Sequence, residues 1–418
     1  MIEKNKAIKI EENDIFANDK LSRENTIRDL SNLLISTNEP FVLSIDASWG
    51  SGKTTFVKLW KAYLKKELDV HSIYFSAWED DFSKEPLIAI MGELHTYIQN
   101  NFPKNKNLHK KLNELKDVSG KIIKRGLPAL IKGATAGVLD LDRGIESAIS
   151  AVTESVAKEL IESYEHDKAI TIKFKELLHQ IIEQIDMDNP LIIFIDELDR
   201  CRPLYAIELL ERLKHIFGIE KLVFVLSIDK KQLSESIKSQ YGNIDTENYL
   251  RRFIDLEYKL NNFSSRNFIT FLSTKYNFYQ DLNDKQYVSK NYNYIEVLST
   301  FSDILSLREI EEIFLRLNII ARTIEASYYL EFENPSDIFN LINFLLIVKV
   351  KLINVYDGKN ADELLLELAK QREISNTSRK IYEYFISNIQ SKYTNQDVLL
   401  DKINFAIKKI DFTDGFQY

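Results

Sequence analysis

The chain has 418 residues, 44% of them apolar and 28% charged, which is the composition of a globular protein and enough length for two domains. Its 55 basic and 63 acidic side chains give a net charge of −8, which argues against a protein that coats nucleic acid through its overall charge. Cys201 is the one cysteine, so an intrachain disulfide and a cysteine-based structural zinc site are excluded.

Helix and strand patterns alternate from residue 19 to residue 228. Apolar residues recur at helical spacing or gather in short β-rich runs. The expected helices are residues 19–35, 53–68, 86–100, 174–185 and 204–216. The expected strands are residues 41–47, 71–77, 191–195 and 221–228. This alternation predicts an α/β fold, a parallel sheet sandwiched by helices.

Residues 101–168 interrupt the alternation. The stretch 104–125 carries eight basic residues, and a run rich in small residues follows it, so we predict a helical insertion. Strand patterns end near residue 264, and the remaining residues predict an all-helical C-terminal domain. We therefore expect one domain over 1–263, with the insertion at about 101–168, and a helical lid domain over 264–418.

No stretch has the roughly 18 to 20 consecutive apolar residues that span a bilayer. The nearest candidates are residues 338–348, which contain two asparagines and run into lysines, and residues 126–139, with Lys132 near the centre. We interpret both as buried or interface helices and expect no membrane span. Because the first residues are charged and show no apolar signal segment, we expect a cytoplasmic protein.

Residues 47–54, ASWGSGKT, join an expected strand to an expected helix. They match the phosphate-loop pattern GxxxxGK[ST] (Walker A) at every fixed position except the first, where Ala47 replaces glycine. Lys53 is expected to reach the β- and γ-phosphates, and the Thr54 hydroxyl to bind Mg²⁺. Ala47 adds one methyl group, which is tolerated if its φ is negative. The expected nucleotide-binding residues are Trp49, Gly50, Ser51, Gly52, Lys53, Thr54 and Thr55.

The buried strand at 191–195 ends in two acids, as the Walker B pattern requires. Asp196 is suited to hold Mg²⁺ opposite Thr54. Glu197 is the candidate general base for the attacking water. Together with the phosphate loop, these acids predict nucleotide binding.

Three motifs resemble the KAP family of P-loop NTPases. They are WGSGKT at 49–54, FSAW at 75–78 and FIDELDRCRP at 194–203. Further matches at 224–229, 249–254 and 307–310 extend the resemblance over roughly residues 15–360. It implies an additional-strand P-loop ATPase that uses ATP and Mg²⁺ and has a helical lid; bacterial members have roles in excluding phage.

The chain departs from the family pattern in three places. Ala47 stands where glycine is usual, and Glu197 stands where a second aspartate is frequent. Residues 101–168 occupy the place where many members carry membrane-spanning helices, so we predict a soluble member.

Several arginines have two interpretations each. Arg308, near the start of a helix in the expected lid, is either a sensor for the γ-phosphate or a helix-surface arginine. Arg251 and Arg252 are either a finger that acts across a subunit interface or a solvated pair. Arg23 is a candidate neighbour of the nucleobase.

Other residues are weighed in the same way. Ser227 or Asp229 is a candidate polar sensor of the attacking water. We expect Trp78 to pack beside the phosphate loop and Cys201 to be a small buried packing residue. The basic run 104–125 is either a solvated helix face or a contact for DNA backbone.

These patterns lead to one functional hypothesis and two alternatives. The hypothesis is an oligomeric ATPase, with Lys53, Glu197 and Arg308 as catalytic residues, that acts as a nucleotide-driven switch or remodeller. It works with a protein effector or sensor in anti-phage defence, a role that comes from the resemblance. The alternatives are an ATP-bound scaffold without turnover and a DNA-dependent motor.

Overall fold

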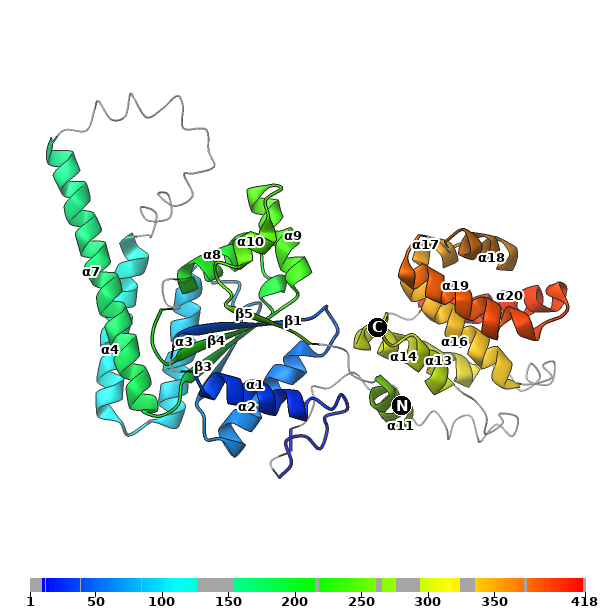
Figure 1. The fold of residues 1–418 in the computed structure, drawn as a ribbon, viewed down its shortest axis with the longest axis horizontal. Coiled ribbons are helices and arrows are strands. Elements are labelled where there is room, and N and C mark those ends of the chain that lie inside the picture. Colours follow the sequence, from blue (N-terminus) through cyan, green and yellow to red (C-terminus); the bar gives the residue numbers. More distant parts are fainter. Residues whose placement is uncertain are drawn as a thin grey trace.

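A five-stranded parallel sheet forms the centre of the first half of the computed structural model (Figure 1). The structure describes residues 10–11, 13–37, 39–83, 85–125, 154–214, 218–260, 265–275, 294–323, 335–371 and 374–415. The strands are β1 (Phe41–Asp46), β2 (Ser72–Ser76), β3 (Leu191–Asp196), β4 (Leu222–Ile228) and β5 (Leu256–Lys259). Their order is β2-β3-β4-β1-β5, and every neighbouring pair is parallel.

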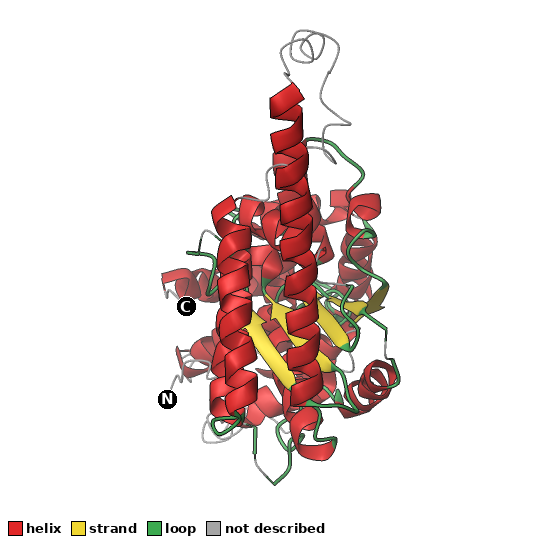
Figure 2. Cartoon of the chain, turned by 90° about the vertical axis from the view of Figure 1, so that its left-hand side faces the viewer, coloured by secondary structure: helices red, strands yellow, loops and turns green. Residues whose placement is uncertain are grey.

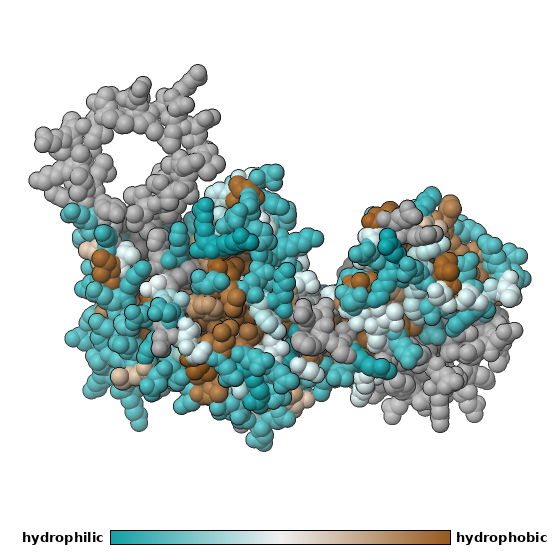
Figure 3. Space-filling model, viewed as in Figure 1, coloured by the Kyte–Doolittle hydropathy of each residue, from teal (hydrophilic) through white to brown (hydrophobic). Residues whose placement is uncertain are grey.

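The four predicted strands are confirmed, and β5 was not predicted. β5 is an edge strand of four residues that alternates apolar and charged side chains, too short to give a β pattern. Hydrophobic residues gather over the region of β5 in Figure 3, and Leu256 is exposed there. β4 lies between the strand of the phosphate loop and the strand of the acids, which is the additional-strand arrangement that the resemblance implies.

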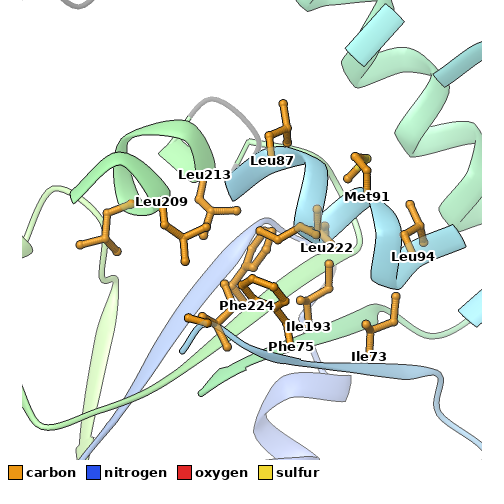
Figure 4. Packing of buried hydrophobic residues seen from close by; sticks show 14 of the residues in the cluster. Ile73, Phe75, Leu87, Met91, Leu94, Ile193, Leu209, Leu213, Leu222 and Phe224 are labelled. Carbon is orange, nitrogen blue, oxygen red and sulfur yellow. The ribbon is translucent and has the colours of Figure 1, made fainter. Parts of the chain in front are cut away.

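The two faces of the sheet carry separate hydrophobic cores, because successive side chains of a strand point in opposite directions. On one face, Ile193 and Phe224 pack against helices α3 (Pro86–Asn101) and α8 (Pro203–Lys214), as Figure 4 shows. On the other, Phe194 packs edge-on against Trp60 of α2 (Lys53–Glu67), with 5.2 Å between ring centroids. The Trp60 indole N–H donates to Ser31 of α1 (Glu24–Ile35) at 2.8 Å, so both helices are fixed on this face.

The predicted insertion begins with helix α4 (Lys106–Arg125), which lies beside α7 (Glu154–Ile185) (Figure 2). Leu108, Leu112 and Leu115 of α4 are buried at helical spacing. The helix expected over 174–185 begins at Glu154 and continues past residue 168, since residues 154–173 contain no proline or glycine. The candidate segment 126–139 lies outside the described residues. None of the helices in the described ranges is long and apolar enough to cross a membrane.

The described residues of the C-terminal region form helices joined by turns, and none of them forms a strand. Its helices are α11 (Ser265–Lys275), α13 (Tyr294–Thr300), α14 (Leu307–Thr323), α16 (Pro335–Lys351), α17 (Ile353–Tyr356), α18 (Ala361–Lys370), α19 (Asn376–Asn388) and α20 (Gln396–Phe412). They share one hydrophobic core whose buried members run from Ile269 to Ile410. Residues 338–348 are part of α16 and pack in this core, which confirms the interpretation of this segment as a buried helix. We propose the domain boundary near residue 264.

Candidate nucleotide-binding site

A cavity of about 650 Å³ lies at the carboxyl ends of the strands, bounded by α11 and α14 on the side of the C-terminal helices. Its volume is in the range of small-molecule sites. The sequence-predicted residues that line it are Trp49, Gly50, Ser51, Gly52, Lys53, Thr54, Thr55, Asp196, Glu197, Arg308 and Arg23. The structure thus brings the two motifs and the lid arginine together around one space.

The phosphate loop joins β1 to α2 and depends on two glycines. Gly50 has φ +79° and Gly52 has φ +84°, in the left-handed region that favours glycine. A Cβ on Gly50 would lie 3.0 Å from the Cβ of Arg308, so α14 packs directly on the loop. Ala47 does not have a positive φ, which is the condition under which its methyl group is tolerated.

Lys53 opens helix α2, and its side chain is almost fully buried. The ammonium group donates to the carbonyl of Ala47 and, at 3.4 Å, to that of Ser48, so it lies against its own loop. Burial lowers the pKa of Lys53, and the carboxylates of Asp199 and Asp229 oppose this effect. A buried cation at the start of a helix, beneath an open cavity, suits a phosphate group.

Asp196 ends β3 and is 1% exposed. One carboxylate oxygen accepts from Ser227 at 2.7 Å and from the backbone N–H of Glu197 at 3.0 Å, and the other accepts from the Tyr74 hydroxyl at 3.1 Å. Burial, and then the charge of Asp196, raise the pKa of Tyr74, so this hydroxyl stays a donor. The sensor candidate Ser227 therefore contacts the acid directly and fixes its orientation.

Glu197 follows with a left-handed backbone, φ +63°. Its Oε2 accepts from Ser76 at the end of β2 at 3.1 Å, and its Oε1 lies 2.7 Å from a guanidinium nitrogen of Arg200. Glu197 therefore has different partners from Asp196, although the two acids are adjacent in the sequence. Ser76 and Arg200 are contacts that the motif alone did not reveal.

A third acid was missed. Asp199 is nearly buried, lines the cavity, and accepts a hydrogen bond from the Trp49 indole N–H. Burial raises the pKa of Asp199, and the charge of Lys53 opposes this. The backbone N–H of Trp49 donates to Asp229 at 3.1 Å, so two acids hold the phosphate loop. Asp199 lies in the 3-10 turn η1 (Leu198–Arg200), three residues after Asp196. This spacing of two acids across one 3-10 turn is the sequence feature that could have identified Asp199.

The remaining candidates divide into residues near the site and residues away from it. Arg23 is buried, with a guanidinium nitrogen 3.5 Å from the carbonyl oxygen of Ser51. Arg251 and Arg252 are exposed after α10 (Thr246–Leu250) and do not line the cavity of their own chain. The expectation for Trp78 was wrong: the residue is 53% exposed and does not line the cavity, and the guanidinium of Arg200 lies 5.9 Å from the centre of its ring. Cys201 is buried, as expected.

Two further predictions concern cations. Thr54 and Asp196 both line the cavity, and Mg²⁺ in such sites takes few protein ligands besides phosphate oxygens and water. Among the described side chains, no group of three or more His, Cys, Asp or Glu residues forms a metal cluster. In the basic run, the ammonium groups of Lys111 and Lys116 bond Gln180 and His95, so part of this run contacts the protein itself.

A search of protein families matches residues 23–324 to the KAP family P-loop domain. The phage T7 exclusion protein of Escherichia coli (strain K12) is 25% identical over 249 residues, which are 57% of this chain and 32% of that protein. The chain therefore spans about a third of the length of this relative.

Solved structures align at low similarity. The Aeropyrum pernix ORC2 protein is 15% identical with a TM-score of 0.32, and the alignment covers 93% of this chain and 94% of that one. DnaA of Aquifex aeolicus is 11% identical with a TM-score of 0.30, covering 92% and 93%. A Walker-type ATPase of Pyrococcus abyssi is 13% identical with a TM-score of 0.32, covering 94% and 91%.

Proposed function

Because the chain belongs to the KAP family of P-loop NTPases, we propose that it is a cytoplasmic ATPase that works as a nucleotide-driven switch or remodeller. The observation that carries this proposal is the single cavity in which the phosphate loop, the acids after β3 and the first turn of α14 meet. A ligand in that cavity contacts both the sheet and the lid.

In this proposal, the loop from Trp49 to Thr55 binds the phosphates of ATP, and Lys53 turns from its own carbonyls toward them. Thr54 and Asp196 would hold Mg²⁺, which would neutralise phosphate charge when bound. Glu197 takes a proton from the attacking water while the water oxygen bonds to the γ-phosphorus. The bond between the γ-phosphorus and the oxygen that bridges to the β-phosphate then breaks, and ADP is released. Arg308 supplies positive charge from the lid.

The packing of α14 supports a switch. Ser306 and Glu309 exchange reciprocal hydrogen bonds at the start of the helix, at 2.6 and 3.3 Å. Glu309 also accepts two bonds from Lys351 of α16, both at 2.8 Å. A shift of the first turn of α14 is thereby passed to the central helix of the C-terminal core.

The proposal includes a homo-oligomer and a partner protein. Arg251 and Arg252 are exposed next to the edge strand β5, where Leu256 is exposed as well. An open edge of this kind suits a neighbouring subunit, to whose site the arginines would then belong. The similarity to a phage T7 exclusion protein supports a role in phage defence with a separate effector or sensor.

An ATP-bound scaffold is the second candidate, and one observation favours it: Glu197 is already bonded by Ser76 and Arg200. A DNA-dependent motor has weaker support, since the internal contacts of Lys111 and Lys116 already use part of the basic run.

ATP hydrolysis by wild-type protein, Lys53→Ala and Glu197→Gln, each with and without duplex DNA, tests the proposal. We expect Lys53→Ala to lose nucleotide binding, and Glu197→Gln to bind ATP while its turnover falls by roughly 10²- to 10⁴-fold. Lys65→Ala, an exposed lysine of the same helix, is the matched control. Bound ATP without turnover in the wild type would support the scaffold; salt-sensitive stimulation by DNA would support the motor.

A further inference from the structure

Both carboxylate oxygens of Glu197 are bonded inside the protein. Arg200 lies 2.7 Å from Oε1, and the Ser76 hydroxyl donates to Oε2 at 3.1 Å. The Glu197 side chain is 14% exposed and that of Arg200 is 32% exposed, so solvent screens this ion pair only in part. A base that accepts a proton from water must direct a lone pair at that water. The two contacts instead fix the orientation of the carboxylate.

The Arg200–Glu197 pair is built into the local backbone. Glu197 has φ +63° and ψ +22°, a left-handed backbone that non-glycine residues rarely adopt. The N–H of Arg200 donates to the carbonyl of Glu197 at 3.1 Å, closing the 3-10 turn η1. Residues 197 and 200 are thus joined twice, by this backbone hydrogen bond and by the ion pair at 2.7 Å.

The groups that hold Glu197 are connected to the exposed turn 77–82. The guanidinium of Arg200 lies 5.9 Å above the Trp78 ring, and the Ser76 hydroxyl accepts from the N–H of Glu79 at 3.4 Å. Asp81 accepts from the backbone N–H of Arg202 at 2.9 Å and from its Nε at 2.8 Å. The turn after β2 and the segment after β3 are thus bonded to each other at the surface.

We propose that Arg200 is a positioning residue that restrains Glu197, so that basal hydrolysis is slow until the ion pair opens. This inference rests on the proposed ATPase function. When the pair is open, the Glu197 carboxylate is available to take the proton of the attacking water, while the γ-phosphoryl group passes to that water and ADP leaves. Movement of the turn 77–82 or of η1 opens the pair.

Steady-state kinetics of Arg200→Ala tests the restraint. We expect kcat to rise roughly two- to fivefold with KM for ATP unchanged, because a partly exposed ion pair supplies about this factor. Arg200→Lys keeps the charge and restores most of the slow rate. Arg379→Ala is the matched control, since this arginine is exposed on α19, contacts neither Glu197 nor the turn 77–82, and is expected to leave kcat unchanged.

A double variant separates restraint from a general structural effect. In the Glu197→Gln background, Arg200→Ala is expected to leave kcat unchanged, because this background has no carboxylate base for the variant to release. A gain that persists in that background overturns the proposal.

The remaining outcomes are also decisive. A wild-type protein that hydrolyses ATP, with Arg200→Ala equal or slower and still folded by circular dichroism, overturns the restraint and leaves the ATPase function intact. If Arg200 instead acts on the phosphate of ATP, the kcat of Arg200→Ala falls, and this result also overturns the restraint. Absence of turnover in both proteins, with ATP bound, overturns the restraint together with the proposed function.

Discussion

The two walls of the cavity are built in different ways. On the sheet side, hydrogen bonds connect neighbouring strand ends: Ser227 and Tyr74 both donate to Asp196, and Trp49 is held by Asp199 and Asp229. On the lid side, α14 touches the loop through packing, with Arg308 and Leu307 against Gly50 and Gly52. The acids of the sheet wall are held by hydrogen bonds between strand ends, whereas the lid wall meets the loop through side-chain packing. The following predictions test this difference.

The largest effect is expected on the sheet wall. Asp196→Asn should lower ATP turnover by roughly 100-fold or more, because it removes the charge proposed to hold Mg²⁺ and places an amide among three donors. Turnover and melting temperature are measured together, with the exposed Asp188→Asn as the control. Near-normal turnover in a folded Asp196→Asn protein would contradict the assignment of this acid.

The contact between the walls is tested by Gly50→Ala. Its positive φ costs about 1 kcal/mol for alanine, and the new Cβ meets Arg308 at 3.0 Å, so we expect a roughly tenfold loss of ATP affinity. Gly92→Ala is the control, because its added Cβ meets no atom within 4 Å. Titration calorimetry with a non-hydrolysable ATP analogue measures both. Equal affinity of the two variants would show that α14 does not pack on the loop in solution.

The lid wall should affect turnover more than binding. We expect Arg308→Ala to lower kcat by about tenfold and to change ATP affinity by less than about threefold, since the loop still holds the phosphates. Arg379→Ala, an exposed arginine of α19, serves as the control. A larger change in affinity than in kcat would assign Arg308 to ground-state binding.

The smallest effect is expected at Asp414, an exposed residue at the surface of the C-terminal helices that does not line the cavity. Burial acts to raise the pKa of Asp414, but hydrogen bonds from Lys349 and Arg316 outweigh it, and the pKa is lowered. The carboxylate therefore stabilises the fold at neutral pH, and this contribution is lost as the pH falls below its ordinary value of 3.8. Asp414→Asn should lower the free energy of unfolding at pH 7 by about 0.5 kcal/mol. It should also remove the part of the pH dependence of that free energy that comes from this carboxylate. Thermal unfolding between pH 7 and pH 3 measures it.

The sequence predicted the sheet wall better than the lid wall. Lys53 and Asp196 were found because a phosphate site needs fixed residue types at fixed spacing next to a strand. Four strands followed from apolar runs, whereas β5 gave no pattern, since an edge strand needs no continuous apolar run. Asp199 was missed because its role depends on a 3-10 turn that local composition does not reveal.

The lid wall depends on tertiary packing. Phe268, Phe271 and Leu272 of α11 line the cavity, but in the sequence they resemble any other apolar residues of an amphipathic helix. Arg308 was selected by its place near a helix start, and only the fold brings it to Gly50. The exposure of Trp78 in the turn after β2 could not be predicted from the sequence either, so the expectation that this residue packs beside the phosphate loop was wrong.

The hydrogen bond from Trp49 to Asp199 gives the protein an internal optical probe. The chain has three tryptophans, and Trp60 is completely buried in the sheet core. Trp49 is 43% exposed and sits in the phosphate loop itself, beside the Asp199 carboxylate, on which the charge of Lys53 acts. When Lys53 turns to a phosphate, the electrostatic field at the indole changes, and with it the emission spectrum. Nucleotide arrival can then be timed by stopped-flow fluorescence of the unlabelled protein, with Trp49→Phe as the silent reference.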